Sequence, residues 1–230
     1  LYFSQRNIAH YDSAVFNTQW RELALAMKAV DPTLLLLGPE THQYTGINGD
    51  EVLDIHSRDW IKEFLTANGD LVDIVSFHRY PFGNFDPFPD ELMKSSQEWD
   101  YIIPNLRQLI LSTTGRDIPI AVTEVNSNWS NRSREETTPD SFLNAIWWAD
   151  SLGRMIGQHV TIVNQFALDG SGGWALLGSQ KPRPSYYVYQ IFSEFGNQVL
   201  FSSSGIEKVS AYAARKADGS LSVILINRSN

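Results

Sequence analysis

The sequence of 230 residues repeats one rhythm four times, a short apolar run followed by a polar loop and a helical stretch. A strand followed by a helix, repeated along the chain, is typical of parallel α/β structure, in which helices cover a buried sheet. The apolar runs occupy residues 34–38, 72–80, 118–124 and 160–168. Helices are predicted at residues 12–30, 59–68, 90–112, 140–157 and 185–195. From residue 198 the pattern becomes that of short strands, at residues 199–201, 209–215 and 221–226.

Each apolar run ends in polar side chains that are suited to chemistry or to ligand binding. These are Glu40 and His42, then His78 and Tyr80, then Glu124 and Asn126, then Gln165 and Asp169. In a (β/α)8 barrel the C-terminal ends of all strands meet on one face, and active sites are built there. Four strand–helix units make half of such a barrel or a small open sheet. The repeated polar ends favour the half barrel.

Glu124 is the strongest catalytic candidate, because it directly follows the buried run Ile120–Thr123. A carboxylate held at the end of a buried strand can act as a nucleophile or as a general base. The alternative is a glutamate that merely begins a solvated loop. His78 and Tyr80 stand two residues apart on the preceding strand and therefore face the same side. Unless they only pack in the core, either can orient the neighbouring carboxylate by a hydrogen bond.

Composition and motifs exclude several other classes of function. Eighteen Lys and Arg against 26 Asp and Glu give a net charge of −8, without a basic run, so neither nucleic acid nor an anionic membrane is expected as a partner. The chain has no cysteine and its five histidines lack ligand spacing, so no metal site is predicted. Residues 170–175 match G-x-G-x-x-A, but Pro182 and Pro184 follow where a helix would have to begin, so no dinucleotide cofactor is predicted.

The aromatic residues divide into two groups. Trp174 and the loop residues Phe82, Phe85, Phe88 and Trp129 are candidates for platforms on which sugar rings stack, or else for packing within the loops. Trp147 and Trp148 lie in the middle of a predicted helix and are expected in the core.

Four segments together resemble a known family. They are residues 20–32, Leu37-Gly38-Pro39-Glu40, Ser76-Phe77-His78-Arg79-Tyr80 and Thr123-Glu124-Val125-Asn126. The pattern resembles the retaining glycoside hydrolases of clan A, in their β-xylosidase-like and heparanase/β-glucuronidase-like branches. The resemblance implies a (β/α)8 barrel with two catalytic glutamates, an acid/base in an Asn-Glu motif that closes the fourth strand and a nucleophile that closes the seventh. Glu124 matches the nucleophile, and His78 and Tyr80 match supporting positions on the sixth strand.

The same resemblance implies which part of the family is present. The four strand–helix units correspond to strands five to eight, so residues 1–197 are expected to form a half barrel and residues 198–230 the start of a C-terminal β-sandwich. No Asn-Glu occurs in the sequence, and residues 1–4 offer neither a helix cap nor strand alternation. We therefore expect a piece of a longer polypeptide whose acid/base precedes residue 1. Glu40 is a poor substitute, because two strand spacings separate it from Glu124 by about 10 Å, against the ~5–5.5 Å that a retaining mechanism needs.

By this resemblance the chain is expected to hydrolyse glycosidic bonds with Glu124 as the nucleophile. The substrate is a carbohydrate, and its expected contacts are His78, Tyr80, Asn126, Gln165, Trp174 and Glu40. Two alternatives stay open: a non-catalytic carbohydrate-binding or structural half barrel, and a different α/β hydrolase in which Glu124 is a general base for water. A half barrel leaves its first and last strands with open edges, so a homodimer that pairs those edges is also expected.

Overall fold

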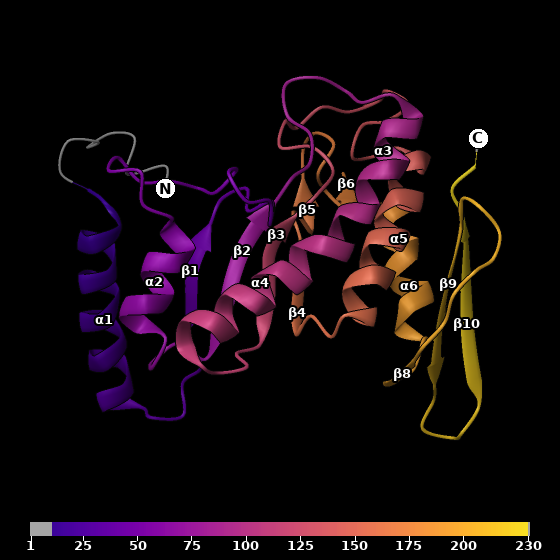
Figure 1. Cartoon of the computed structure of the whole chain (residues 1–230). Coiled ribbons are helices and arrows are strands. Elements are labelled where there is room, and N and C mark those ends of the chain that lie inside the picture. The colour runs from indigo at the N-terminus through magenta and orange to yellow at the C-terminus, as the bar shows by residue number, and fades with distance from the viewer. Residues whose placement is uncertain (1–10, 230) are drawn as a thin grey trace. The chain divides into compact units, whose positions relative to one another are not determined.

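The structure is a computed structural model that describes residues 11–229. The interpretation of residues 1–4 lies outside the described residues. The helices are α1 (Ser13–Val30), α2 (Trp60–Asn68), α3 (Pro89–Ser95), the short 3-10 helix η2 (Ser96–Glu98), α4 (Trp99–Thr114), α5 (Phe142–Gly157) and α6 (Pro184–Ser193). The strands are β1 (Leu37–Thr41), β2 (Ile74–Arg79), β3 (Ile120–Val125), β4 (Ile162–Gln165), β5 (Asp169–Gly170), β6 (Leu177–Gly178), β7 (Lys181–Pro182), β8 (Gln198–Leu200), β9 (Val209–Arg215) and β10 (Leu221–Asn227) (Figure 1). None of the described helices has the length and apolarity required to cross a bilayer.

The strands form three sheets. The main sheet has the order β1-β2-β3-β4, and β1 pairs with β2 in parallel. A second sheet, β10-β9-β8, is antiparallel, and a small third sheet, β5-β6-β7, lies within the segment after β4. The chain divides into two compact units, one of residues 1–79 and 101–123 and the other of residues 80–100 and 124–230.

In the first unit, helices α1 and α2 begin at aspartate caps. The Asp12 carboxylate accepts a hydrogen bond from the backbone N–H of Val15 at 2.9 Å, and Asp59 caps α2 in the same way. The two helices pack against each other through aromatic rings: the rings of Trp20 and Phe64 meet edge to face with centroids 4.9 Å apart. Figure 1 shows α2 between α1 and β1.

The first strand begins later than the sequence predicts. The apolar run at residues 34–38 was expected to be buried, but Leu35 is 66% exposed and β1 begins only at Leu37. The reason is local, because the Asp31 carboxylate accepts hydrogen bonds from both the backbone N–H and the hydroxyl of Thr33. This turn draws the chain away from the sheet before the strand can start.

Two other predicted elements differ for equally local reasons. The single helix expected at residues 90–112 is interrupted at η2, where Ser95 and Ser96 donate their hydroxyl hydrogens to backbone carbonyls three residues back. The strand expected at residues 160–168 stops at Gln165, because Ala167 pairs with the loop that follows: its N–H donates to Trp174 O and its carbonyl accepts from Leu176 N.

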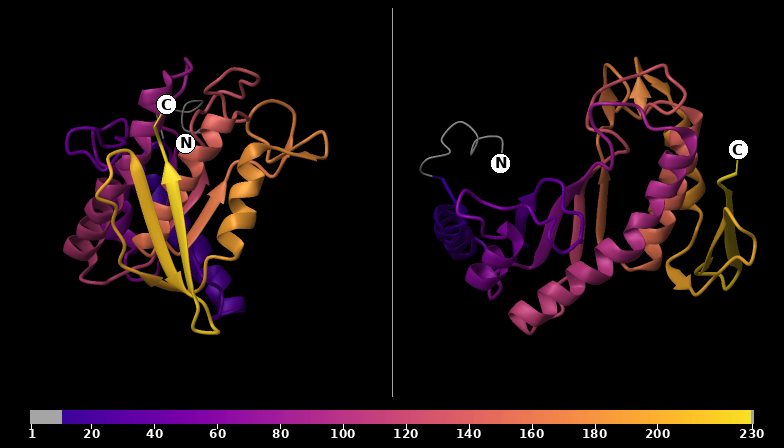
Figure 2. Two further views of the ribbon diagram at one scale, coloured as in Figure 1. Left: turned by 90° about the vertical axis from the view of Figure 1, so that its right-hand side faces the viewer. Right: turned by 45° about the horizontal axis from the view of Figure 1, so that its top comes forward.

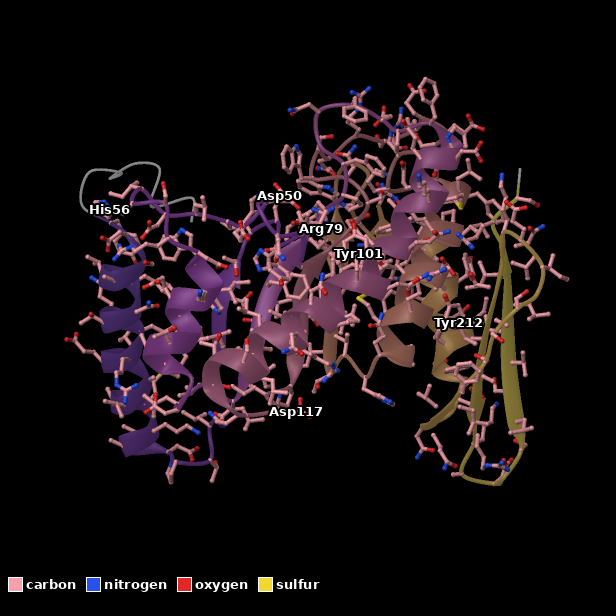
Figure 3. All side chains as sticks on the ribbon, in the orientation of Figure 1. Asp50, His56, Arg79, Tyr101, Asp117 and Tyr212 are labelled. Carbon is pink, nitrogen blue, oxygen red and sulfur yellow. The ribbon has the colours of Figure 1, made fainter. Side chains whose placement is uncertain are left out.

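In the second unit, α5 is the central element. Trp147 and Trp148 on this helix are fully buried, as predicted, and α6 packs along it. Tyr212 on β9 donates to a carboxylate oxygen of Asp150 on α5 at 2.7 Å, and its ring lies where a Cβ on Gly153 would come within 2.5 Å, so only glycine permits this approach. Figure 2 shows β9 and β10 as a long antiparallel pair, and Figure 3 labels Tyr212 on β9.

Candidate functional site

Tyr80 and Glu124 form the central pair of the candidate site, in the second unit. Glu124 is the penultimate residue of β3, and Tyr80 directly follows the last residue of β2. The Tyr80 hydroxyl donates to Oε2 of Glu124 at 2.7 Å, which is the hydrogen bond expected from the spacing of these residues. Burial, the hydrogen bond and the negative charge of Glu124 all raise the pKa of Tyr80. The phenol therefore stays protonated at neutral pH and serves as a permanent donor to the carboxylate.

The loops that follow Tyr80 and Glu124 are joined by backbone hydrogen bonds. Phe82 N donates to Ser127 O at 2.9 Å, and Trp129 N donates to Phe82 O at 3.0 Å. The Asn128 side chain, which is buried, adds a hydrogen bond to Phe85 O at 2.9 Å. These contacts fix the backbone just beyond the phenol and the carboxylate. They also leave Phe85, Phe88 and Trp129 exposed on the loops, where their stacking role stays a prediction.

Asn126 is placed to hold the backbone at the end of β4. Its side chain is completely buried, its amide nitrogen donates to Phe166 O at 2.7 Å, and its amide oxygen accepts from Ser127 N at 2.8 Å. Both polar atoms of Asn126 therefore have partners within the chain, and its expected substrate contact stays a prediction.

Gln165 and Trp174 differ in how their polar atoms are used. Both side-chain polar atoms of Gln165, at the end of β4, are buried and have no hydrogen-bond partner among the described residues. A buried amide without a hydrogen-bond partner is uncommon, because an unmade hydrogen bond costs about 1–3 kcal/mol. A bound polar molecule can supply the partner without a change in the fold. Trp174 donates from Nε1 to Asn128 O at 2.9 Å, and its ring packs edge to face on Phe166.

A second cluster of polar side chains lies at strand ends of the first unit. Nε2 of His78 on β2 lies 2.9 Å from Oε2 of Glu40 on β1, and the Thr123 hydroxyl on β3 donates to the same oxygen. Burial would raise the pKa of Glu40, but the hydrogen bonds from His78 and Thr123 outweigh it, so the pKa is lowered and the carboxylate is charged. Sequence reasoning gave neither the pairing of His78 with Glu40 nor a contact to Thr123, although all three residues lie in the segments that resemble the family.

A large cavity of the second unit is separate from the central pair. A cavity of about 750 Å³ in the second unit lies between α5 and the β8–β9 segment, and its lining includes Arg154, Lys208 and Tyr212 but not Glu124. Cavity size therefore does not carry the assignment of the site, which rests on the contacts of Tyr80 and Glu124.

Metal and cofactor sites can be tested only for residues 11–229. Within that range the structure has no cluster of three His, Cys, Asp or Glu side chains able to hold a metal ion. The G-x-G-x-x-A segment at residues 170–175 forms bends and short strands, and the next helix begins only at Pro184. The segment therefore lacks the helix N-terminus that binds a pyrophosphate.

Comparison with known proteins gives a similarity in sequence and several similarities in fold. No family model matches the sequence. Heparanase of Bos taurus is 22% identical over 153 residues, which cover 62% of this chain and 26% of heparanase. The chain thus spans about a quarter of the length of this relative.

Solved structures are similar over nearly the whole chain. A GH39 β-xylosidase from Caulobacter crescentus matches with a TM-score of 0.63 and 21% identity, over 90% of this chain and 42% of that one. An α-L-arabinofuranosidase from Thermotoga maritima matches with a TM-score of 0.69 and 15% identity, over 96% of this chain and 48% of that one. The chain therefore has an α/β fold, with a sheet of four strands, that matches part of the barrel domains of the clan A glycoside hydrolases.

Proposed function

We propose that this chain is the C-terminal half of a retaining glycoside hydrolase in which Glu124 is the nucleophile. The observation that carries the proposal is a hydrogen bond of 2.7 Å from the Tyr80 phenol to a carboxylate, that of Glu124, which is partly exposed at the end of a strand. A glutamate at the end of a strand, oriented by a donor that stays protonated, is suited to attack the anomeric carbon of a sugar. The likeness in sequence to heparanase and in fold to β-xylosidase and arabinofuranosidase structures supports the same reaction class.

In this proposal the barrel half comprises residues 1–197, with its strands corresponding to strands five to eight, and residues 198–230 begin a β-sandwich. The substrate is a carbohydrate. Gln165 offers its orphaned amide to a sugar hydroxyl, Trp174 offers a ring face, and His78, Asn126 and Glu40 complete the expected contacts.

The proposed chemistry needs a second carboxyl group. In a retaining mechanism a general acid protonates the leaving oxygen, which typically contributes about 10²–10⁴ in rate. Glu124 is proposed to react without such an acid only when the leaving group of the substrate departs without a proton. Attack by Glu124 forms the glycosyl ester and breaks the bond to the leaving group, which departs as an anion.

The test is covalent trapping with the 2,4-dinitrophenyl 2-deoxy-2-fluoro-β-glycosides of xylose, glucose and glucuronic acid. The fluorine slows hydrolysis of the ester more than its formation, so the expected result is a stoichiometric mass increase, located by peptide mapping to Glu124. Glu124→Gln should show no increase, and Glu22→Gln, an exposed position on α1, should be labelled like the parent. Absence of the ester with all three reagents would sink the proposal.

One alternative stays open, a carbohydrate-binding half barrel without turnover. That alternative predicts saturable binding of xylo- or gluco-oligosaccharides, measured by calorimetry, with no ester at Glu124. If Glu124 is instead a general base for water, 4-nitrophenyl glycosides are hydrolysed without any trapped ester.

We also propose that two copies associate through the open edges of the main sheet. The strand order β1-β2-β3-β4 makes β1 and β4 its outer strands, and unpaired strand edges favour pairing with another chain. Sedimentation at micromolar concentration should show a dimer, and a compact monomer would contradict this part of the proposal.

A further inference from the structure

Glu40 occupies an unusual backbone position at the end of β1. The pairing of β1 with β2 joins Pro39 to Ser76 and then Thr41 to Phe77, so Glu40 is an extra residue in the strand, a β-bulge. Its φ is +60°, in the left-handed region that a glutamate enters only with backbone strain. A bulge redirects a side chain, and here the redirected side chain is a carboxylate.

The contacts of Glu40 reach across the strand ends of the first unit. One of its oxygens, Oε2, lies 2.9 Å from Nε2 of His78 on β2 and also accepts a hydrogen bond from the Thr123 hydroxyl on β3. The contact with His78 requires a proton on Nε2. A single oxygen therefore joins β1 to both following strands. The carboxylate is 42% exposed, so the contact is made at the edge of bulk water and not in the core.

The two partners of Glu40 are close in sequence to the central pair. Thr123 immediately precedes Glu124 in β3, and His78 precedes Tyr80 by two residues. Thr123 and Glu124 are consecutive residues of β3, and Arg79 alone separates His78 from Tyr80, so contacts at Thr123 and His78 act on the backbone segments that carry the nucleophile and its phenol donor. A displacement of about 1 Å at a reacting group can cost 10²-fold in rate, so such a restraint has a catalytic consequence.

We propose that Glu40 is a positioning residue, whose carboxylate fixes the imidazole of His78 and the hydroxyl of Thr123 and thereby sets the strand segments that carry Tyr80 and Glu124. The inference rests on the proposed function, and it adds a positioning part to the sugar contact proposed for Glu40. The glutamate side chain is long enough to contact both His78 and Thr123, and this accounts for a glutamate at a backbone position that favours glycine.

The first experiment measures how fast the 2-deoxy-2-fluoro glycosides label Glu124 in Glu40→Gln and Glu40→Ala. Glutamine keeps the shape and a weaker acceptor oxygen, whereas alanine removes both contacts. The expected maximal labelling rate falls about 10-fold in Glu40→Gln and about 100-fold in Glu40→Ala, and the half-saturating concentration changes less than about 3-fold. Glu22→Gln serves as the matched control for loss of a carboxylate in the same unit.

The second experiment does not depend on activity. In protein labelled with ¹⁵N-histidine, the ring signals of His78, assigned with a His78→Gln variant, should shift in both Glu40 variants, while those of His56 and His159 stay in place. Unchanged signals of His78, or labelling rates equal to the parent, would overturn the inference while the proposed function stands. If the parent itself is never labelled, the proposed function fails and the positioning role fails with it. Circular dichroism establishes that each variant is folded.

Discussion

The second unit contains two carboxylate–tyrosine pairs with the same contact distance. Tyr80 donates to Glu124 at 2.7 Å, and Tyr212 donates to Asp150 at 2.7 Å. Burial is the largest cause that raises the pKa of both phenols, followed by the negative charge of the partner carboxylate or the hydrogen bond to it. The hydrogen bond alone therefore cannot show which of the two pairs is functional.

The surroundings of the two carboxylates distinguish them. The Asp150 side chain has no exposed surface, accepts from Ser96 Oγ at 2.6 Å and from Arg154 Nε at 2.9 Å, and lies 3.6 Å from Arg228 Nε. Glu124 is partly exposed and stands at the end of a strand. A carboxylate enclosed by donors and cations holds elements together, here β9 to α5, whereas a carboxylate that reacts must be reachable. The comparison teaches that access, more than pairing, separates a reactive carboxylate from a structural one.

The largest effect is expected for Glu124→Gln. Loss of the proposed nucleophile should reduce the rate of reaction with activated glycosides by about 10⁴-fold or more. Because Glu124 is partly exposed, the free energy of unfolding in urea should change by less than about 1 kcal/mol. A variant that unfolds much more easily than the parent would show that Glu124 is a structural carboxylate like Asp150.

Asp150→Asn should produce the opposite pattern. Removing the charge leaves Arg154 and Arg228 without their buried counterion, and breaking a buried ion pair in this way costs about 3–5 kcal/mol in unfolding free energy. Asp90→Asn is the matched control, because Asp90 is 66% exposed in its ion pair with Lys208 and exposed pairs contribute about 0–1 kcal/mol. Equal stability of these two variants, measured by urea unfolding, would contradict the structural role of Asp150.

The two tyrosines extend the comparison at a smaller scale. Tyr80→Phe removes the donor that orients Glu124 and should slow labelling by about 10- to 100-fold with little loss of stability. Tyr212→Phe should lower the free energy of unfolding by about 1.5–3 kcal/mol, as expected for a hydrogen bond to a charged group, and leave labelling unchanged. Labelling kinetics and urea unfolding, measured on both variants, separate the catalytic role of Tyr80 from the structural role of Tyr212. Similar effects of the two substitutions would contradict this difference in role.

The central pair could be predicted from the sequence because it depends on regular strand geometry. Period-2 alternation and the position of Glu124 after a buried run were sufficient to predict a hydrogen bond between neighbouring strand ends, which Tyr80 makes. The buried faces of the helices were predictable because helix geometry is regular too, as the burial of Trp147 and Trp148 shows.

The contacts of Glu40 and Asp150 could not be predicted, for two different physical reasons. The bulge at Glu40 shifts the register of β1 by one residue, and although Gly38 and Pro39 precede it, they do not show which side chain the bulge redirects or toward which partners. Asp150 meets Tyr212 across 62 positions of sequence, so their pairing follows from the tertiary packing of β9 on α5. Local patterns predict elements and their faces, whereas irregular backbone and long-range packing decide these contacts.

The smallest expected effect concerns the pH dependence of stability at Glu40. Like Asp150, Glu40 has hydrogen-bond partners on other elements, and like Glu124 it is exposed to water. Its pKa in the folded chain is lowered below the ordinary value of 4.5 by His78 and Thr123, which outweigh burial. Glu40 therefore stabilises the fold above the unfolded pKa, and this contribution is lost as the pH falls through the folded value. Because the side chain is 42% exposed, the contribution should be below about 1 kcal/mol. The difference in urea unfolding free energy between the parent and Glu40→Gln should shrink as the pH falls below the unfolded pKa of Glu40. A difference that grows in acid would show that Glu40 is held protonated, and Glu40 would then resemble neither Asp150 nor Glu124.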